Sequence, residues 1–330
     1  MHVSSYTTMK VFPKKGIDCI MILLMLCTII ATTDLTISSN SIDSTNHEIS
    51  LADSFPILIT SDEAFTILGF PGNGTIAEPY LIENFRITSS NQLDSAIMIG
   101  NTTAYFTIQN CEITSNYIGI RIHSTVAAGT AKILNNTITS MNKSGGGISV
   151  GSDQVHIENN TISGFIQGIH INEADYTTII GNSVLLSYYQ GINIRYSSSN
   201  TIIYNEIRNS NQHGLAIVGE TSMNNIIYSN IFVNNSNSAA YEIDGVITGE
   251  THSQGYDGGA INKWYNSSTH IGNKWDDYAG EGSYVIDGAA NSADLYPERY
   301  GPYPTQSNFI AIPGVVTIIG LISIISTRNR

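Results

Sequence analysis

Apolar and polar residues alternate in six short segments that align with one another without gaps: FTIQNCEI (106–113), AKILNNTI (131–138), VHIENNTI (155–162), TTIIGNSV (177–184), NTIIYNEI (200–207) and NNIIYSNI (224–231). Their last residues are 25, 24, 22, 23 and 24 positions apart. A second alternating segment follows each of the first five: IGIRI (118–122), GGISV (146–150), QGIHI (167–171), QGINI (190–194) and HGLAI (213–217). This alternation predicts strands rather than helices, and repetition at such a period marks a solenoid.

The predicted fold is all-β, a coil of short parallel strands in which each turn lies about 4.8 Å above the last. Inward isoleucine and valine side chains would stack into one continuous apolar column. Leucine-rich repeats would need leucine in the recurrent positions, which here hold isoleucine.

The paired asparagines in the middle of the segments have a structural explanation. The second residue of each pair falls in one row, and an inward asparagine at a turn can satisfy backbone groups of its own coil and bond the asparagine above it. The predicted ladder is Cys111, Asn136, Asn160, Asn182, Asn205 and Ser229. Cys111 would then be buried, inert and reduced.

Apolar segments lie near both ends of the chain. Residues 1–33, basic and then apolar, predict a signal peptide, with an N-terminal anchor as the alternative. Residues 34–55 form a polar linker. The apolar run 309–326 is followed by Arg328 and Arg330, which predicts a transmembrane helix with the body outside the cell.

The composition limits the partners. The net charge is −13, with no cluster of lysine and arginine, which argues against nucleic acid. Of three cysteines only Cys111 lies in the main body, so a disulfide framework is excluded there. Sequons expected of an exported glycoprotein begin at Asn73, Asn101, Asn135, Asn142, Asn159, Asn234 and Asn266.

The repeats resemble the right-handed parallel β-helix superfamily of carbohydrate-binding proteins and sugar hydrolases, in its NosD-like branch. GFPGNGTIAEPYLIENFRI (69–87) resembles the start of such proteins, and GNKWDDYAGEGSYVIDGAANSADLYP (272–297) resembles their closing segment. The resemblance implies a capping segment at 56–90, coils of 22–26 residues over 91–245 and a closing segment at 246–304.

The resemblance also raises two metals. In many relatives an acidic loop in the closing segment suggests calcium; here it is shortened to residues 279–283, leaving Asp276, Asp277 and Asp287 as calcium candidates. The NosD name suggests copper, but a soft copper site needs methionine, cysteine or clustered histidine. The body has no Met–His motif, so no cofactor is expected, and the resemblance is taken at the level of the fold. Its histidines considered for copper are His123, His156, His170 and His213.

Strand alternation also predicts an outward polar stripe about 15 Å long over four coils, in which Ser149 and Gly151 lie between larger residues. Such a stripe suits a polar sugar chain, although it is equally expected of a solvated sheet face. Its functional members would be Arg121, His123, His170, Asn172, Asn193 and Arg195.

Catalysis has weaker support. Glycoside hydrolysis needs paired carboxylates, and the stripe holds none. Gln212-His213-Gly214 resembles the G-H-G phrase of polygalacturonases but lacks the preceding aspartates, and Arg121 and Arg195 lack the acidic cluster that a lyase would need. The preferred hypothesis is a membrane-anchored cell-surface protein that binds or scaffolds carbohydrate or another envelope component. A polysaccharide hydrolase or lyase and a non-binding surface coat are the alternatives.

Overall fold

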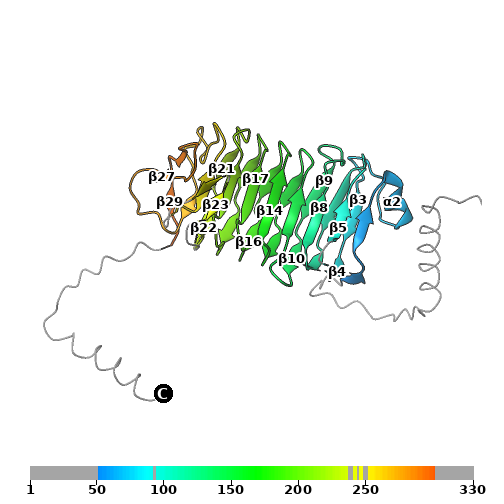
Figure 1. Cartoon of the computed structure of the whole chain (residues 1–330). Helices are drawn as coiled ribbons and strands as arrows, with labels where there is room; N and C mark the ends of the chain where they lie inside the picture. Colours follow the sequence, from blue (N-terminus) through cyan, green and yellow to red (C-terminus); the bar gives the residue numbers. More distant parts are fainter. Residues whose placement is uncertain (1–50, 92–93, 237–240, 244, 248–251, 302–330) are drawn as a thin grey trace, which may run out of the picture. The chain divides into compact units, whose positions relative to one another are not determined.

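The computed structural model describes residues 51–91, 94–236, 241–243, 245–247 and 252–301, which form a parallel β-solenoid (Figure 1). Each coil contributes one strand to each of three parallel sheets, as the alternating segments predict. The predicted signal peptide and the predicted transmembrane helix lie outside these residues. No helix within the described part of the chain is long and apolar enough to span a membrane.

The three sheets run along the solenoid. The ten-stranded sheet contains β1 (Ala52–Ser54), β4 (Phe85–Ser89), β7 (Glu112–Ser115), β10 (Thr137–Ser140), β13 (Thr161–Ser163), β16 (Ser183–Leu185), β19 (Glu206–Arg208), β22 (Ile231–Val233), β26 (Lys274–Trp275) and β29 (Glu298–Arg299). The eight-stranded sheet contains β2 (Ile57–Ile59), β5 (Ser95–Ile99), β8 (Ile118–Ile122), β11 (Gly146–Val150), β14 (Gln167–Asn172), β17 (Ile192–Arg195), β20 (Leu215–Val218) and β25 (Gly255–Asp257). The seven-stranded sheet contains β3 (Tyr80–Glu83), β6 (Phe106–Gln109), β9 (Ala131–Leu134), β12 (His156–Glu158), β15 (Thr178–Ile180), β18 (Thr201–Ile203) and β21 (Ile226–Tyr228).

Inward side chains of successive coils stack in register. The column inside the eight-stranded sheet is wholly buried, and each full burial of such a side chain contributes about 1.5–3 kcal/mol. Its members are Ile57, Ile97, Ile120, Ile148, Ile169, Ile192 and Leu215. Strand β1 already pairs with β4, so the solenoid begins inside the residues predicted as linker.

The turn between the seven-stranded and ten-stranded sheets explains both residues of each asparagine pair. The first residue has a left-handed backbone, with φ of 56° at both Asn135 and Asn159, a conformation that asparagine tolerates better than most residues. The second residue is buried and bonds along the solenoid axis. Asn160 Oδ1, for example, accepts from the backbone N–H and the side-chain amide of Asn136, each at 2.9 Å.

The ladder departs from the prediction at its last coil. Asn205 donates to Asn230, not to Ser229, which instead has the left-handed backbone of the turn, with φ of 57°. Ile207 accordingly pairs with Phe232, so this coil is 25 residues long and the ungapped alignment is one residue out of register. The double asparagine at 224–225 caused the error, because either residue fits the aligned position.

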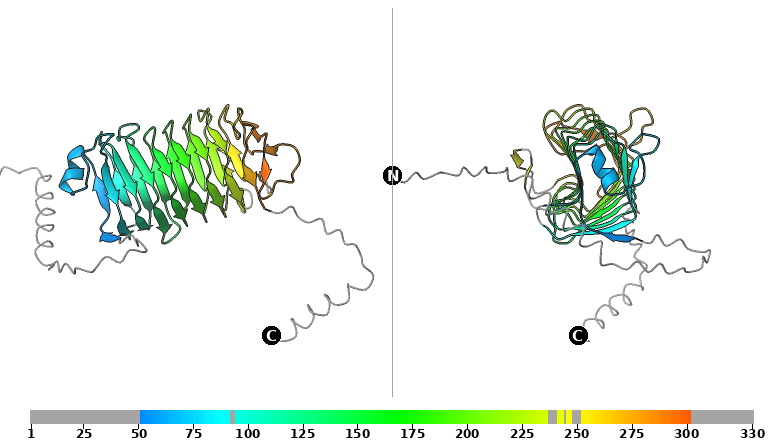
Figure 2. Two further views of the ribbon diagram at one scale, coloured as in Figure 1. Left: turned by 180° about the vertical axis from the view of Figure 1, so that it is seen from behind. Right: turned by 90° about the vertical axis from the view of Figure 1, so that its right-hand side faces the viewer.

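Both ends of the solenoid are covered (Figure 2). At the first, helix α2 (Asp62–Ile67) buries Phe65 against Tyr80, with ring centroids 4.7 Å apart. At the other, Phe232 and Trp275 stack at 4.2 Å. The small antiparallel pairs β23 (Glu242–Ile243) with β24 (Val246–Ile247) and β27 (Tyr284–Val285) with β28 (Ala293–Asp294) lie in the closing part of the chain.

Acidic side chains end the ladders. Asn230 donates to Asn273, whose backbone N–H donates to Asp294 Oδ2 at 2.6 Å. A second ladder, which the alternation did not reveal, begins with the backbone N–H of Thr177 and reaches Asp257. Between them it passes through Asn200, Asn225 and Asn262.

The thiol of Cys111 occupies the first position of the main ladder. Its backbone N–H donates to Asn136 Oδ1 at 3.0 Å, and burial raises the pKa of the thiol to about 11. We therefore expect Cys111 in the folded protein to resist iodoacetamide at neutral pH, because the thiolate is the reactive form. Peptide mass spectrometry should find Cys111 alkylated only after denaturation. Rapid alkylation of the folded protein would contradict the burial.

Candidate ligand-binding groove

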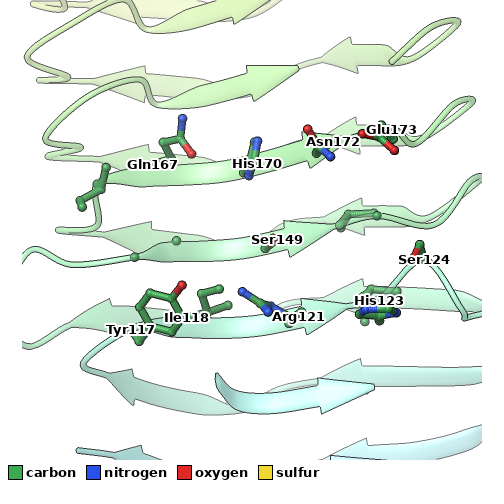
Figure 3. Close-up of a pocket in the computed structure, with 16 residues that line it drawn as sticks. Tyr117, Ile118, Arg121, His123, Ser124, Ser149, Gln167, His170, Asn172 and Glu173 are labelled. Carbon is green, nitrogen blue, oxygen red and sulfur yellow. The ribbon is translucent and has the colours of Figure 1, made fainter. Parts of the chain in front are cut away.

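The outward face of the eight-stranded sheet holds a polar groove over β8, β11 and β14 (Figure 3). Strand pairing places Ser149 directly between Arg121 and His170. Ser149 and Gly151 are much smaller than their neighbours on the coils before and after, so the sheet is hollowed at β11. The groove has a volume of about 570 Å³.

Four of the six residues predicted for the stripe line this groove: Arg121, His123, His170 and Asn172. The other two lie on the next strand, β17. Asn193 pairs with His170 and is buried, whereas Arg195 pairs with Asn172 and is exposed. The six residues therefore share one sheet face, and the hollow itself is confined to the three strands before β17.

The edges of the groove come from residues at or just beyond the ends of the strands, which strand alternation does not identify. Tyr117 and Gln167 lie where β8 and β14 begin, and Ser124 and Glu173 lie at the opposite edge (Figure 3). Gln167 donates to Gln190 Oε1 at 3.1 Å, and that glutamine contacts the next one, Gln212. The recurring Gln before glycine or histidine, in QGIHI, QGINI and QHGLAI, was the signal for this row.

Two guanidinium groups act on the histidine in the groove. Burial, reinforced by the positive charges of Arg195 and Arg121, lowers the pKa of His170 to about 4. His170 is therefore neutral at pH 7 and can both donate and accept a hydrogen bond. The carboxylate among the residues lining the groove is Glu173, at one edge.

Polar atoms on this face lack partners. Arg121 Nε and Asn193 Oδ1 are buried, and neither has a hydrogen-bond partner among the described residues. Arg195 stacks its guanidinium over the Tyr196 ring at 4.9 Å. The face therefore offers donors, acceptors and aromatic surface along several coils.

His213 lies away from the groove, in the closing part of the solenoid. It is fully buried, its Nε2 lies 3.2 Å from Asp287 Oδ2, and its Nδ1 contacts the hydroxyl of Tyr241. Burial is the largest effect on its pKa, which is lowered. These contacts hold the imidazole inside the fold rather than presenting it to a substrate.

The calcium candidates are not brought together as one cluster. Asp276 and Asp277 both accept from the side-chain amide of Gln254, at 2.7 and 2.8 Å. Asp287 instead faces His213 and the backbone N–H of Ser253. Within the described residues no group of three or more His, Cys, Asp or Glu side chains has an arrangement that could hold a metal ion.

The histidines considered for copper are also dispersed. His123 and His170 line the groove, with His123 bonded to the Thr125 hydroxyl. His156 lies on the seven-stranded sheet and contacts Glu158 Oε2 at 2.7 Å. In the part of the chain that the structure describes, His123, His156 and His170 therefore do not form a clustered soft-metal site.

The sequence matches a family model. Residues 126–280 match the family described as periplasmic copper-binding protein (NosD). This segment is NosD-like. The match extends from β9 to β26, so it includes β11 and β14 but leaves out Arg121 and His123. A comparison with curated proteins finds no match.

A comparison with solved structures finds distant similarities. The full-length tailspike protein 2 from Escherichia coli O157:H7 bacteriophage CAB120 is 9% identical, with a TM-score of 0.40 over 76% of this chain and 42% of its own. The present chain thus spans less than half of that protein. The A-module of Azotobacter vinelandii mannuronan C-5 epimerase AlgE4 is 11% identical, with a TM-score of 0.31 over 68% of this chain and 78% of its own.

Proposed function

We propose that this protein binds a sugar chain along the outward face of its eight-stranded sheet. The observation that carries the proposal is the groove over β8, β11 and β14, which is lined by the polar side chains of Arg121, His170 and Asn172. The hydroxyl groups of a sugar chain can both donate hydrogen bonds to these side chains and accept hydrogen bonds from them.

The shape of the groove supports an extended ligand. The hollow at Ser149 lies between larger side chains on β8 and β14, and the polar face continues onto β17. Tyr117 borders the hollow, and the exposed rings of Tyr189 and Tyr196 lie farther along the same coils. Aromatic rings with a polar hydroxyl suit the mixed apolar and polar faces of a pyranose.

The acid content of the groove favours binding over hydrolysis. Glycosidases place two carboxyl groups on either side of the scissile bond. Among the described residues that line this groove, Glu173 is the one carboxylate. A polysaccharide-cleaving enzyme remains the alternative, and it is separated from a binder by measuring turnover.

We further propose that the protein works at the cell envelope. The basic and apolar residues 1–33 support export, and the apolar run 309–326 followed by arginines supports anchoring. In this arrangement the groove would meet glycans outside the cytoplasm.

The test compares the full chain with a variant carrying Arg121→Ala, His170→Ala and Arg195→Ala on a glycan array. We expect the variant to lose at least tenfold in retention, because all three polar side chains lie on the proposed surface. The matched control carries Lys132→Ala and Tyr204→Ala, two exposed residues on the coils away from this face. Equal retention by both variants would contradict the proposal, and release of reducing or unsaturated sugar ends that the variant loses would identify an enzyme.

A further inference from the structure

The two arginines on the groove face differ from other arginines of this acidic protein. Arg86 contacts Asp53 and Glu112, and Arg208 contacts Glu206. Within the described residues, neither Arg121 nor Arg195 forms an ion pair. The chain has a net charge of −13, yet two guanidinium groups without an ion pair lie on one of its faces. Solubility does not require this arrangement, whereas a ligand bound at this face would explain it.

These guanidinium groups create a positive potential over the groove. Both are close enough to His170 to disfavour its protonation. The opposing charge among the lining residues is Glu173, at the edge beyond Asn172. At physiological ionic strength charges beyond about 8 Å are largely screened, so a ligand in the groove is affected mainly by the charged groups close to it.

We propose that the sugar chain bound by this groove is acidic, and that Arg121 and Arg195 each pair with a carboxylate or sulfate group of the ligand. This inference rests on the proposed sugar-binding function and specifies its ligand class. Guanidinium groups pair well with both kinds of anion, because their planar donors match two oxygens at once.

The positions of the arginines indicate a polymer rather than a single small anion. Arg121 lies on β8 and Arg195 on β17, with β11 and β14 between them. Three steps between parallel strands correspond to about 14 Å along the solenoid. Each arginine therefore meets a different acidic group of one chain, and the uncharged His170, Asn172 and Ser149 between them contact the intervening hydroxyls.

The test measures the dissociation constants of the full chain for four immobilised polymers: polygalacturonate, dextran sulfate, neutral dextran and single-stranded DNA. We expect both acidic polysaccharides to bind at least tenfold more tightly than dextran, with monomeric galacturonate a poor competitor. Comparing the dissociation constants for polygalacturonate and dextran sulfate shows whether the groove prefers a carboxylate or a sulfate group. Raising the salt concentration should weaken the acidic polymers selectively.

Substitution locates the anion contacts. Arg121→Gln and Arg195→Gln should each weaken binding of the preferred acidic polymer about tenfold, which corresponds to about 1.4 kcal/mol for the loss of one charged hydrogen bond. Lys132→Gln, which removes one positive charge from the seven-stranded sheet, should leave binding unchanged. Arg121→Lys keeps the charge and should retain more affinity than Arg121→Gln, which separates charge from any damage to the fold.

Each contrary result has a definite meaning. Equal binding of dextran, or losses in the arginine variants no larger than in Lys132→Gln, would overturn the acidic ligand while leaving sugar binding intact. Failure to bind any polysaccharide would overturn both proposals. Binding of single-stranded DNA as tight as that of the acidic polysaccharides would overturn the choice of a sugar.

Discussion

Replacing Asn160 by alanine should lower the free energy of unfolding by about 3–5 kcal/mol, because the side chain is a fully used link in the main ladder. Its amide nitrogen donates to Ile133 O at 2.9 Å, Glu158 O at 3.1 Å and Asn182 Oδ1 at 2.9 Å. Its oxygen accepts two bonds from Asn136. Alanine would remove all five bonds and leave their partners buried.

The neighbouring asparagine is the matched control. Asn159 is exposed and has φ of 56°, which glycine adopts freely. Asn159→Gly should therefore change the free energy of unfolding by less than about 1 kcal/mol. The two substitutions test adjacent residues of the same type, one inside the ladder and one outside it.

Thermal unfolding followed by far-ultraviolet circular dichroism measures the difference. For a domain of this size, a loss of about 4 kcal/mol should lower Tm by on the order of 10 °C in Asn160→Ala. The Asn159→Gly protein should melt close to the unchanged protein. Similar melting of both variants would show that the ladder bonds contribute little net stability.

The repeat made most of this fold predictable. Nearly every coil places a large apolar residue, usually a β-branched one, at the same inward position, so burial of one row determines the register of the next. The failure at Ser229 has a local cause, because the sequence offers two adjacent asparagines at 224–225. The register is fixed by the stacking of Phe232 on Trp275 and by the bonds of Asn230 to its neighbours in the ladder. Contacts with the closing segment decide this register, and alternation within one coil contains no information about them.

The second ladder was missed for a related reason. Asn200 and Asn225 stand immediately before their strands and read as ordinary turn residues in the sequence. Their bonds along the solenoid become evident only when coils of unequal length are stacked. Asn262, the next member, is 37 residues beyond Asn225, well outside the period of the repeat.

The sequence predicted the strand residues at the bottom of the groove but not the residues at its edges. Alternation placed Arg121 and His170 on the outer face, as the strand register has them. Tyr117 and Glu173 lie in turns, where the direction of a side chain depends on backbone geometry rather than on alternation. Ser149 on β11 and Gly151 immediately after it create the hollow, and in the sequence they appeared only as small residues within the stripe.

Acidification from pH 7 to pH 4 should destabilise the protein, and His170→Gln should remove at most about 3 kcal/mol of this loss. The pKa of His170 is about 4 in the folded protein, against about 6.5 for an ordinary histidine. Between these values the unfolded chain binds a proton and the folded chain does not, so the free energy of unfolding falls as the pH falls through this window. Above about pH 6.5 His170 is uncharged in both the folded and the unfolded chain, so the protein keeps the full free energy of unfolding that it loses on acidification.

Urea unfolding at a series of pH values from about 4 to 8 checks this expectation. At pH 7 the His170→Gln protein should be nearly as stable as the unchanged protein, since no hydrogen bond of the His170 side chain was found among the described residues. The two curves should separate as the pH falls, because the unchanged protein loses stability through His170 and the His170→Gln protein does not. Asn172→Gln, a non-titrating change on the same strand, should not alter the slope of the free energy of unfolding against pH. Arg195→Gln should make this slope shallower, because one positive charge that repels protonated His170 is lost. A slope that His170→Gln does not alter would mean that this imidazole protonates as readily in the folded chain as in the unfolded one.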